Sequence, residues 1–578
     1  MNRWFKYAKP YLPYFIIGPL CMIIEVAGEV VMPKLLSVII NSANEGNLTI
    51  ASSLGIMLAM AAVAVVMMAG GVGGAYFGAK ASVNFASDLR SEVFAKVQKF
   101  SFANIDKFST GSLVTRLTND ITQIQNFINM MLRLALRAPG MMIAALIMAI
   151  AIKPSLSVVF AVTLPIMAVI IIFVISRAFP RFGQMQTKVD ALNSTVQENV
   201  TNVRVVKSFV REDYEVEKFG KSNRDLKDAS MSAVKTMIIL QPALTLCMNL
   251  TTLVVIWLGG KIVVSGGMPV GDLSAFITYV TQILSSLMMI TMIFMNASRA
   301  IASGKRIAEV LDEVPDINDE GAKFPDARVK DGKIEFKNVS YRYFKDSEDK
   351  VLDNISLTIE PGTTVGIIGS TGCGKTTLVS MISRLYDADE GHILIDGIDV
   401  RDYSLKNLRD GIGMVLQKNT LFSGTINDNL RWGDEEATDE EIQLASEASQ
   451  AHKFVSVFNE GYETEIDQGG TNVSGGQKQR LCIARTLLKK PKVIILDDST
   501  SAVDSATEAA IRSAFSSTLK DSVKIIIAQR ISSVMDSDSI VVMDDGKITG
   551  VGTHEELLKI NDEYREIYNS QMDSKEAM

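Results

Sequence analysis

The chain has 578 residues, of which 47% are hydrophobic and 21% are charged, and its mean hydropathy is +0.20. This composition is too apolar for a single water-soluble domain, and the length has room for a membrane block of several helices followed by one or two soluble domains. The net charge of -7 excludes the basic footprint of a nucleic-acid-binding protein, so we expect no nucleic-acid partner.

The cysteines are too few and too scattered for a disulfide framework or a paired-cysteine metal site. They are Cys21, Cys247, Cys373 and Cys482. The N-terminal segment begins with Arg3 and Lys6 and runs into an apolar stretch that has no small-residue cleavage site. We interpret it as a retained first membrane helix rather than a signal peptide.

Six apolar runs of about 20 residues or more are long enough to cross a hydrocarbon core of about 30 Å. They cover 13–40, 52–79, 130–152, 155–178, 237–260 and 272–297. Three of the connections are short, whereas the two long ones are rich in Lys and Arg and keep helix-like apolar spacing. By the positive-inside rule, we expect the long connections and both termini to be cytoplasmic, with the membrane helices continuing into the cytoplasm.

Several polar side chains fall within these apolar runs. Glu25 and Glu29 share one helix face because they are four residues apart, and Arg133 and Arg137 do the same at the start of the third run. Charges at this depth normally face a bundle interior or a wet cavity, although arginines near a helix end also snorkel to the interface.

Methionines follow one stripe of the sixth run and are either adaptable ligand contacts or ordinary packing. They are Met288, Met292 and Met295. We predict a substrate cavity that includes Glu25, Glu29, Arg137, Met288 and Met292.

The far ends of the two long connections mix aromatic and charged residues. One segment covers 102–111 and contains Phe108, and the other covers 208–214 and contains Phe209 and Arg211. They are either solvated turns or docking segments, and the chain that follows favours docking.

After residue 299 the composition changes to Asp, Glu, Gly, Pro and Lys. We therefore predict a membrane domain at 1–300, a linker at 301–331 and a soluble domain at 332–578.

A strand-like run at 364–368 leads into a phosphate-binding loop (P-loop) pattern, which a helical segment follows. The residues of the pattern are Gly369, Ser370, Thr371, Gly372, Cys373, Gly374, Lys375, Thr376 and Thr377. The backbone N–H groups and the helix N-terminus suit phosphate oxygens. Lys375 is expected to neutralise the β- and γ-phosphates of ATP and Thr376 to bind Mg²⁺.

Two more motifs belong with the P-loop. The apolar strand 493–496 delivers Asp497 to the Mg²⁺ site, an arrangement known as Walker B. Before it, the small residues of a signature sequence open a helix whose N-terminus is free to bind an anion. The signature residues are Ser474, Gly475, Gly476 and Gln477.

A P-loop, a Ser-Gly-Gly-Gln signature and Asp497, behind six membrane helices, resemble a half-transporter of the ATP-binding cassette (ABC) exporter family over nearly the whole chain. The resemblance implies a six-helix α-helical membrane domain with long cytoplasmic extensions, followed by an α/β P-loop nucleotide-binding domain. It also implies ATP and Mg²⁺ as cofactors and a lipid bilayer as environment.

The resemblance assigns further residues. Tyr343 matches the aromatic that stacks on adenine, and Gln417 matches a glutamine that contacts Mg²⁺ and senses the membrane domain. The segment 501–504, ending at Asp504, matches the D-loop. In this family two nucleotide-binding domains pair head to tail and sandwich two ATP, each P-loop facing the partner's signature. The segments at 102–111 and 208–214 match the coupling helices, the second of which docks on the partner.

Two residues depart from the family pattern. Asp498 stands where the family has a Glu as general base, and Gln529 stands where it has a His that contacts the γ-phosphate. Aspartate is one methylene shorter than Glu, and Gln cannot carry a proton. The histidines of the chain are His392, His452 and His554. None of them replaces the family histidine that contacts the γ-phosphate. Gln468, where many exporters have Glu, is a smaller departure.

These departures predict a degenerate site that binds ATP and hydrolyses it poorly, in one half of a heterodimeric exporter. The intact signature then completes the hydrolytic site of a sequence-distinct partner that carries Glu and His and has an altered signature. The alternatives are a homodimeric exporter with slow hydrolysis and an ATP-gated membrane regulator with little transport.

The expected mechanism is alternating access that exports small amphipathic molecules, lipids or peptides. The resemblance suggests a bacterial inner membrane as location, with both termini and the nucleotide-binding domain in the cytoplasm.

Overall fold

A computed structural model describes residues 2–46, 49–343, 348–498 and 503–576. The chain divides into two compact units. The membrane unit consists of Met1–Gln98 and Gly111–Asp312, and the soluble unit consists of Lys99–Thr110 and Glu313–Met578.

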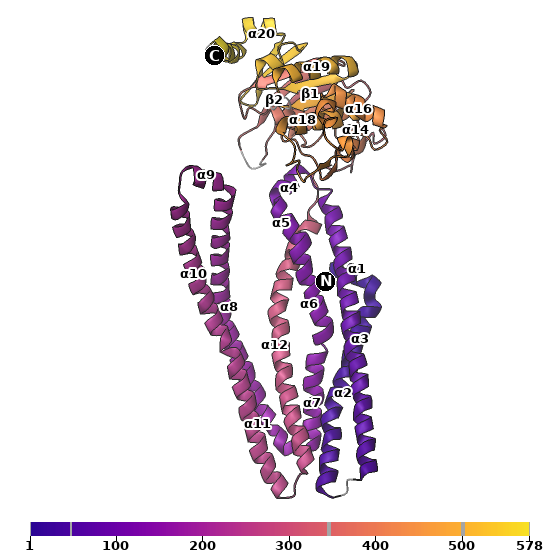
Figure 1. Cartoon of the computed structure of the whole chain (residues 1–578), viewed down its shortest axis with the longest axis vertical. Helices are drawn as coiled ribbons and strands as arrows, with labels where there is room; N and C mark the ends of the chain where they lie inside the picture. Colours follow the sequence, from indigo (N-terminus) through magenta and orange to yellow (C-terminus); the bar gives the residue numbers. More distant parts are fainter. Residues whose placement is uncertain (1, 47–48, 344–347, 499–502, 577–578) are drawn as a thin grey trace. The chain divides into compact units, whose positions relative to one another are not determined.

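The membrane unit is helical in all of its described elements (Figure 1). Its helices are α1 (Asn2–Ala8), α2 (Leu12–Asn44), α3 (Ile50–Val97), α5 (Thr110–Thr115), α6 (Ile121–Leu134), α7 (Arg137–Ile152), α8 (Pro154–Thr201), α9 (Val203–Ser208), α10 (Glu212–Ile238), α11 (Leu240–Val264) and α12 (Val270–Asp312). Six helical segments of the described chain are long and apolar enough to cross a membrane. They are Arg3–Asn44, Ile50–Val97, Thr110–Ile152, Pro154–Thr201, Glu212–Val264 and Val270–Asp312. The prediction of six membrane helices with long polar extensions is confirmed.

Two of the predicted apolar runs are broken shortly before a proline. In the first, α6 ends at Leu134 and α7 begins at Arg137, two residues before Pro139. In the second, α10 ends at Ile238, four residues before Pro242, and α11 begins at Leu240. Proline has no N–H to donate to the carbonyl four residues earlier, and its ring clashes with that carbonyl. The runs predicted at 130–152 and 237–260 are therefore not single regular helices.

Small residues let α2 and α3 approach closely. A Cβ on Gly70 would lie 2.8 Å from the carbonyl oxygen of Cys21, and one on Gly74 would lie 2.8 Å from Cε of Met22. Such contacts are typical of membrane helices, which associate through close packing. The buried ring of Phe160 on α8 stacks on Phe276 of α12 at 5.7 Å, so these two helices share one core.

Two long helices form a hairpin in this unit. Helices α8 and α10 run side by side and are joined at their ends by α9 (Figure 1). Helix α12 extends to Asp312, into the segment predicted as a linker. The residues after the apolar run lack Gly and Pro apart from Gly304, so nothing stops the helix before Asp312. The predicted domain boundaries stay predictions.

The described residues of the soluble unit form three sheets and short helices. Its strands are β1 (Ile334–Tyr341), β2 (Leu352–Ile359), β3 (Thr364–Gly369), β4 (Glu390–Ile395), β5 (Ile398–Asp399), β6 (Ile412–Val415), β7 (Gly424–Thr425), β8 (Glu465–Ile466), β9 (Val493–Asp497), β10 (Val523–Ile527), β11 (Ser539–Asp544) and β12 (Lys547–Gly552). Its helices are α4 (Phe102–Phe108), α13 (Lys375–Ile382), α14 (Leu405–Asp410), α15 (Ile426–Arg431), α16 (Asp439–Ala448), α17 (His452–Val455), α18 (Gly475–Leu488), α19 (Ser505–Thr518), α20 (His554–Ile560) and α21 (Asp562–Glu576).

The six-stranded sheet has the order β12-β11-β3-β10-β9-β6, and all of its pairings are parallel except that of β12 with β11. Both faces are buried, since Val493 and Ile495 of β9 join one core cluster and Ile494 and Leu496 join the other. Strands β3, β10 and β9 are neighbours, so the loops at their carboxyl ends meet at one edge. Ligands of open α/β sheets bind at this edge.

Candidate functional site

The P-loop follows the carboxyl end of β3 and leads into α13. Gly372 and Gly374 have φ angles of +90° and +95°, which glycine adopts at no steric cost. A Cβ on Gly374 would lie 2.8 Å from the carbonyl oxygen of Val351, so this turn has no room for a side chain. The backbone N–H groups at the start of α13 would then cradle a phosphate group.

Lys375 is the first residue of α13, and its side chain curls back over the loop. Its Nζ donates to the carbonyl oxygens of Gly369 at 2.9 Å and Ser370 at 2.6 Å. Ser370 in turn donates through its hydroxyl to Asp544 at the end of β11, at 3.1 Å. The ammonium group thus lies within the loop that would hold phosphate oxygens.

Asp497 meets Thr376 at the end of β9. The Thr376 hydroxyl donates to Oδ1 of Asp497 at 3.1 Å, and the Asp497 side chain is buried. Its Oδ2 has no hydrogen-bond partner among the described residues. Burial raises the pKa of Asp497, and the neighbouring Asp498 raises it further.

A buried carboxylate oxygen without a partner is costly unless a cation or a donor binds it. A hydroxyl and a carboxylate are oxygen ligands of the kind that Mg²⁺ prefers. These residues fit the metal: Thr376 and Asp497 would hold Mg²⁺, which would neutralise charge on the phosphates of ATP.

Asp498, Gln529 and Gln417 converge beside the Mg²⁺ residues. The Gln529 Nε2 donates to Oδ2 of Asp498 at 2.9 Å, and Gln417 also hydrogen-bonds the Asp498 side chain. Burial raises the pKa of Asp498, and these two hydrogen bonds partly offset the rise. The backbone of Asp498 is left-handed, with φ of +46°, a conformation that L-residues rarely adopt outside functional or strained sites.

Sequence reasoning missed Gln571 of α21. Its Nε2 donates to the Gln529 carbonyl oxygen at 2.8 Å, and its Oε1 accepts from the Ile531 N–H at 2.9 Å. These two bonds hold the loop after β10. No local motif marks Gln571, because it lies 42 residues from Gln529 along the chain.

Tyr343 lies two residues after the end of β1 and is 47% exposed. Its ring packs edge-on against Tyr341 at 5.3 Å and Tyr386 at 5.5 Å, and its hydroxyl lies 2.9 Å from Oγ1 of Thr377 on α13. The sequence did not mark Tyr386 as part of this cluster. The expected adenine contact of Tyr343 stays a prediction.

The signature opens α18. Ser474 is the N-cap residue, its Oγ accepting from the Gln477 N–H at 3.3 Å while its own N–H donates to Oε1 of Gln477 at 2.9 Å. This capping box explains why a Gln stands three residues after the Ser. Gly475 and Gly476 follow on an accessible surface.

Asp504 is the N-cap residue of α19, and its Oδ1 accepts from the Thr507 N–H at 2.9 Å. The first two residues of the predicted D-loop, Ser501 and Ala502, lie outside the described residues.

The first predicted coupling segment is helix α4, which belongs to the soluble unit. Phe102 packs on Tyr386 with ring centroids 6.0 Å apart, and Asn104 Nδ2 donates to Glu313 at 2.9 Å. Phe108 is buried and stacks on Phe100 at 5.6 Å. This segment is docked rather than solvated.

The second segment lies between α9 and α10, within the membrane unit. Phe209 is 73% exposed, and Arg211 is also exposed. Its docking on a partner stays a prediction.

The charged residues of the predicted cavity form a triad. Arg137 of α7 contacts both Glu25 at 3.1 Å and Glu29 at 3.2 Å on α2. Gln282 of α12 donates to the backbone oxygen of Glu29 at 3.0 Å. Arg133 does not join this triad and is exposed.

The methionines do not share one environment. Met288 packs against the membrane core, Met292 is 55% exposed, and the side chain of Met295 lies outside the described residues.

Comparisons with known proteins agree with this architecture. Residues 15–287 match the ABC transporter transmembrane region, and residues 352–501 match the ABC transporter family. The chain is 38% identical to the ABC transporter ATP-binding protein YfiB of Bacillus subtilis over 99% of this chain and 98% of YfiB. It is 40% identical to the ABC transporter ATP-binding protein Rv1273c of Mycobacterium tuberculosis over 86% of each chain. Its fold matches a bacterial Atm1-family ABC exporter solved with ATP bound, with a TM-score of 0.81, 24% identity and 97% and 98% coverage of the two chains.

Proposed function

Because this chain belongs to the ABC transporter family, and so couples ATP hydrolysis to transport across a membrane, we propose that it is one half of a heterodimeric exporter. In this proposal its P-loop, Asp497, Asp498 and Gln529 form a degenerate site that binds ATP and hydrolyses it poorly. Its signature completes the hydrolytic site of a sequence-distinct partner.

The observation that carries this proposal is the contact between Asp498 and Gln529 at 2.9 Å. A general base needs a free carboxylate oxygen within reach of the attacking water. Here one carboxylate oxygen of Asp498 accepts a hydrogen bond from Gln529, and the same carboxylate also hydrogen-bonds Gln417. Gln529 is neutral at every pH, so it brings no positive charge to the γ-phosphate.

The exposed signature supports a partner. Ser474 and Gln477 cap α18 mutually, which leaves the N-terminus of a 14-residue helix ordered and accessible. An ordered helix N-terminus attracts a phosphate group. In a head-to-tail pair this end closes over the partner's ATP, while the partner's signature closes over the P-loop of this chain.

The intramembrane triad supports an amphipathic cargo that carries positive charge. Two carboxylates and one guanidinium leave a net charge of -1 when all three are ionised. Charges within a membrane domain mark substrate or ion pathways. Alternating access would expose this triad to each side in turn, with the basic long connections and both termini on the cytoplasmic side of a bacterial inner membrane.

Restoring the family residues tests the site assignment. We expect the double variant Asp498→Glu with Gln529→His to raise the ATP turnover of the purified chain by about 10²-fold, because a catalytic group misplaced by about 1 Å costs that much. Asp498→Asn is the matched control and brings no gain. If the double variant leaves turnover unchanged, the geometry of these two residues does not limit hydrolysis.

A further inference from the structure

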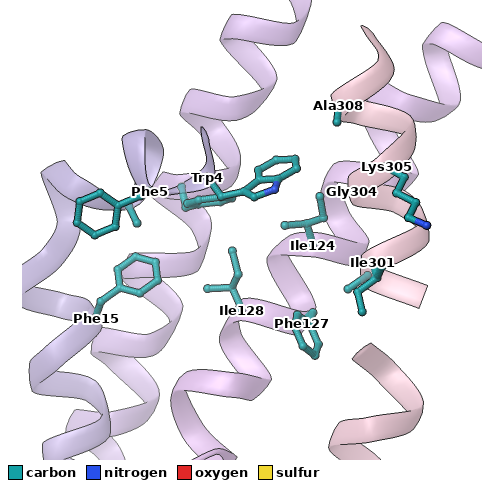
Figure 2. Close-up of a pocket in the computed structure, with 13 residues that line it drawn as sticks. Trp4, Phe5, Phe15, Ile124, Phe127, Ile128, Ile301, Gly304, Lys305 and Ala308 are labelled. Carbon is teal, nitrogen blue, oxygen red and sulfur yellow. The ribbon is translucent and has the colours of Figure 1, made fainter. Parts of the chain in front are cut away.

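A cavity of about 690 Å³ lies within the membrane unit, where α1 meets α2, α3, α6 and α12 (Figure 2). Its walls are formed by Trp4, Phe5, Ala8, Phe15, Phe85, Ile124, Phe127, Ile128, Ala300, Ile301, Gly304, Lys305 and Ala308. This volume is within the range of about 300–1,000 Å³ that is typical of ligand pockets. The cavity is separate from the Glu25–Glu29–Arg137 triad, none of whose residues lines it.

The lining is aromatic and aliphatic, and Lys305 is its one charged member among the described residues. The neighbouring cations of α1 are already paired, Arg3 with Asp312 and Lys6 with Glu92 at 2.9 Å. Lys305 is exposed and has no acidic side chain within ion-pairing distance in the described part of the chain. An apolar body with one anionic group would therefore match this cavity.

Helix α1 indicates the depth of the cavity. It places Trp4 between Arg3 and Lys6, and one 3-10 turn, Lys9–Tyr11, separates α1 from the apolar helix α2. Tryptophan and basic residues gather where lipid headgroups meet the acyl chains. In Figure 2 the Trp4 ring points toward α12, and Lys305 lies at the edge of the labelled side chains.

We propose that this cavity holds an acyl chain of an anionic phospholipid from the surrounding bilayer, with the lipid phosphate at Lys305. Basic pockets between membrane helices bind such headgroups. The cavity is separate from the triad and Lys305 would repel the positively charged cargo proposed above, so we assign the lipid a resident role; this assignment rests on the proposed charge of the cargo. This inference holds for a heterodimer and for a homodimer, and it does not depend on the degenerate site.

Gly304 offers a way to fill the cavity. A Cβ at this position would lie 3.6 Å from Cζ2 of Trp4, an ordinary van der Waals contact. Alanine therefore fits without displacing Trp4, whereas Leu would occupy the space of the acyl chain. Both residues favour a helix more than Gly does, so neither change weakens α12 through propensity.

Trp4 itself is the probe. The chain has three tryptophans, of which Trp257 is 62% exposed on a membrane helix and Trp432 lies in the soluble unit. In a Trp257→Phe background, the full-length chain in its native assembly is reconstituted with phosphatidylglycerol or phosphatidylcholine carrying brominated acyl chains, which quench tryptophan on contact. We expect phosphatidylglycerol to quench Trp4 with about fivefold higher apparent affinity, the effect of one basic residue on an anionic lipid.

The variants separate headgroup from acyl-chain binding. Lys305→Gln is expected to remove the preference and Lys305→Arg to keep it. Gly304→Leu is expected to reduce quenching by both lipids, whereas Gly304→Ala leaves it unchanged.

Equal quenching by the two lipids in the parental chain overturns the proposal, as does full quenching of Gly304→Leu. ATP-dependent movement of phosphatidylglycerol between leaflets would make the lipid cargo and overturn its resident role. Loss of quenching on adding a partner half would assign the cavity to a protein segment instead.

Discussion

At the scale of single residues, Asp497 and Asp498 place two carboxyl groups side by side in a partly buried site. Burial raises the pKa of both above the ordinary value of 3.8. A carboxyl whose pKa is raised on folding binds its proton more tightly in the folded state. In the metal-free protein these two carboxyls therefore contribute stability that is fully present at low pH and is lost as the pH rises through the ordinary pKa toward the raised one.

Because burial raises the pKa of Asp497, its charged form destabilises the metal-free protein, and removing that charge in Asp497→Asn has a predictable effect on stability. We expect the variant to unfold at an equal or higher temperature than the parental chain at neutral pH without Mg²⁺, since it lacks the buried charge. We also expect it to lose the extra thermal stabilisation that Mg-ATP gives the parental chain. Thermal unfolding of both chains with EDTA and with Mg-ATP measures this, and a variant that Mg-ATP still stabilises fully would contradict the metal assignment.

The residues that the sequence could predict are those in short local patterns. The P-loop from Gly369 to Thr377 is recognisable because its glycines, lysine and hydroxyls recur at fixed offsets within one turn. Gln571 and Tyr386 carry no such pattern and reach the site only through the tertiary fold. Glu25, Glu29 and Arg137 were each identifiable as charges in apolar runs, but their pairing depends on how α2 and α7 pack.

At the scale of elements, α4 is the part of the first long connection that docks on the soluble unit. Its contacts are the Phe102 ring on Tyr386 and the Asn104 side chain on Glu313. If α4 transmits closure of the nucleotide-binding domains to the membrane helices, weakening this contact lowers transport more than hydrolysis.

The test for α4 is Phe102→Ala. We expect the ratio of molecules transported to ATP hydrolysed to fall about two- to tenfold, the effect of losing one aromatic pair. Lys107→Gln is the matched control on the same helix, because it removes only a surface ion pair whose Lys is 62% exposed, and such pairs contribute little. Equal effects of the two changes would argue against a specific role for Phe102.

Helix boundaries were the part of the elements least visible in sequence. Hydropathy marks only the apolar portion of a helix such as α8, which runs to Thr201 although its apolar run ends near residue 178. The polar remainder is stabilised by packing on α10, for which single-sequence hydropathy has no signal. Proline removes a defined hydrogen bond near the breaks at Pro139 and Pro242. The sequence does not single out these two positions, because α2 and α8 each contain two interior prolines without a break.

At the scale of the whole molecule, the proposed heterodimer gives different roles to the two nucleotide motifs of the chain. In this proposal Lys375 serves the degenerate site, whereas Ser474 serves the partner's hydrolytic site. We expect Lys375→Ala to weaken ATP binding but to spare part of the turnover of the heterodimer. Ser474→Arg is expected to lower turnover by about 10²-fold or more, as loss of a preorganised transition-state contact does. Equal losses in the two variants, measured as ATPase rates of the assembled transporter, would contradict this division.

The measurement that tests the central claim most directly is the Mg-ATP turnover of the purified chain alone, compared with the chain co-purified with a sequence-distinct half-transporter. Nucleotide binding serves as the folding control in both samples. We predict that the chain alone binds ATP with little turnover and that turnover appears with the partner. Brisk turnover by the chain alone would contradict the account, because Asp498 and Gln529 would then be sufficient for hydrolysis in a homodimer.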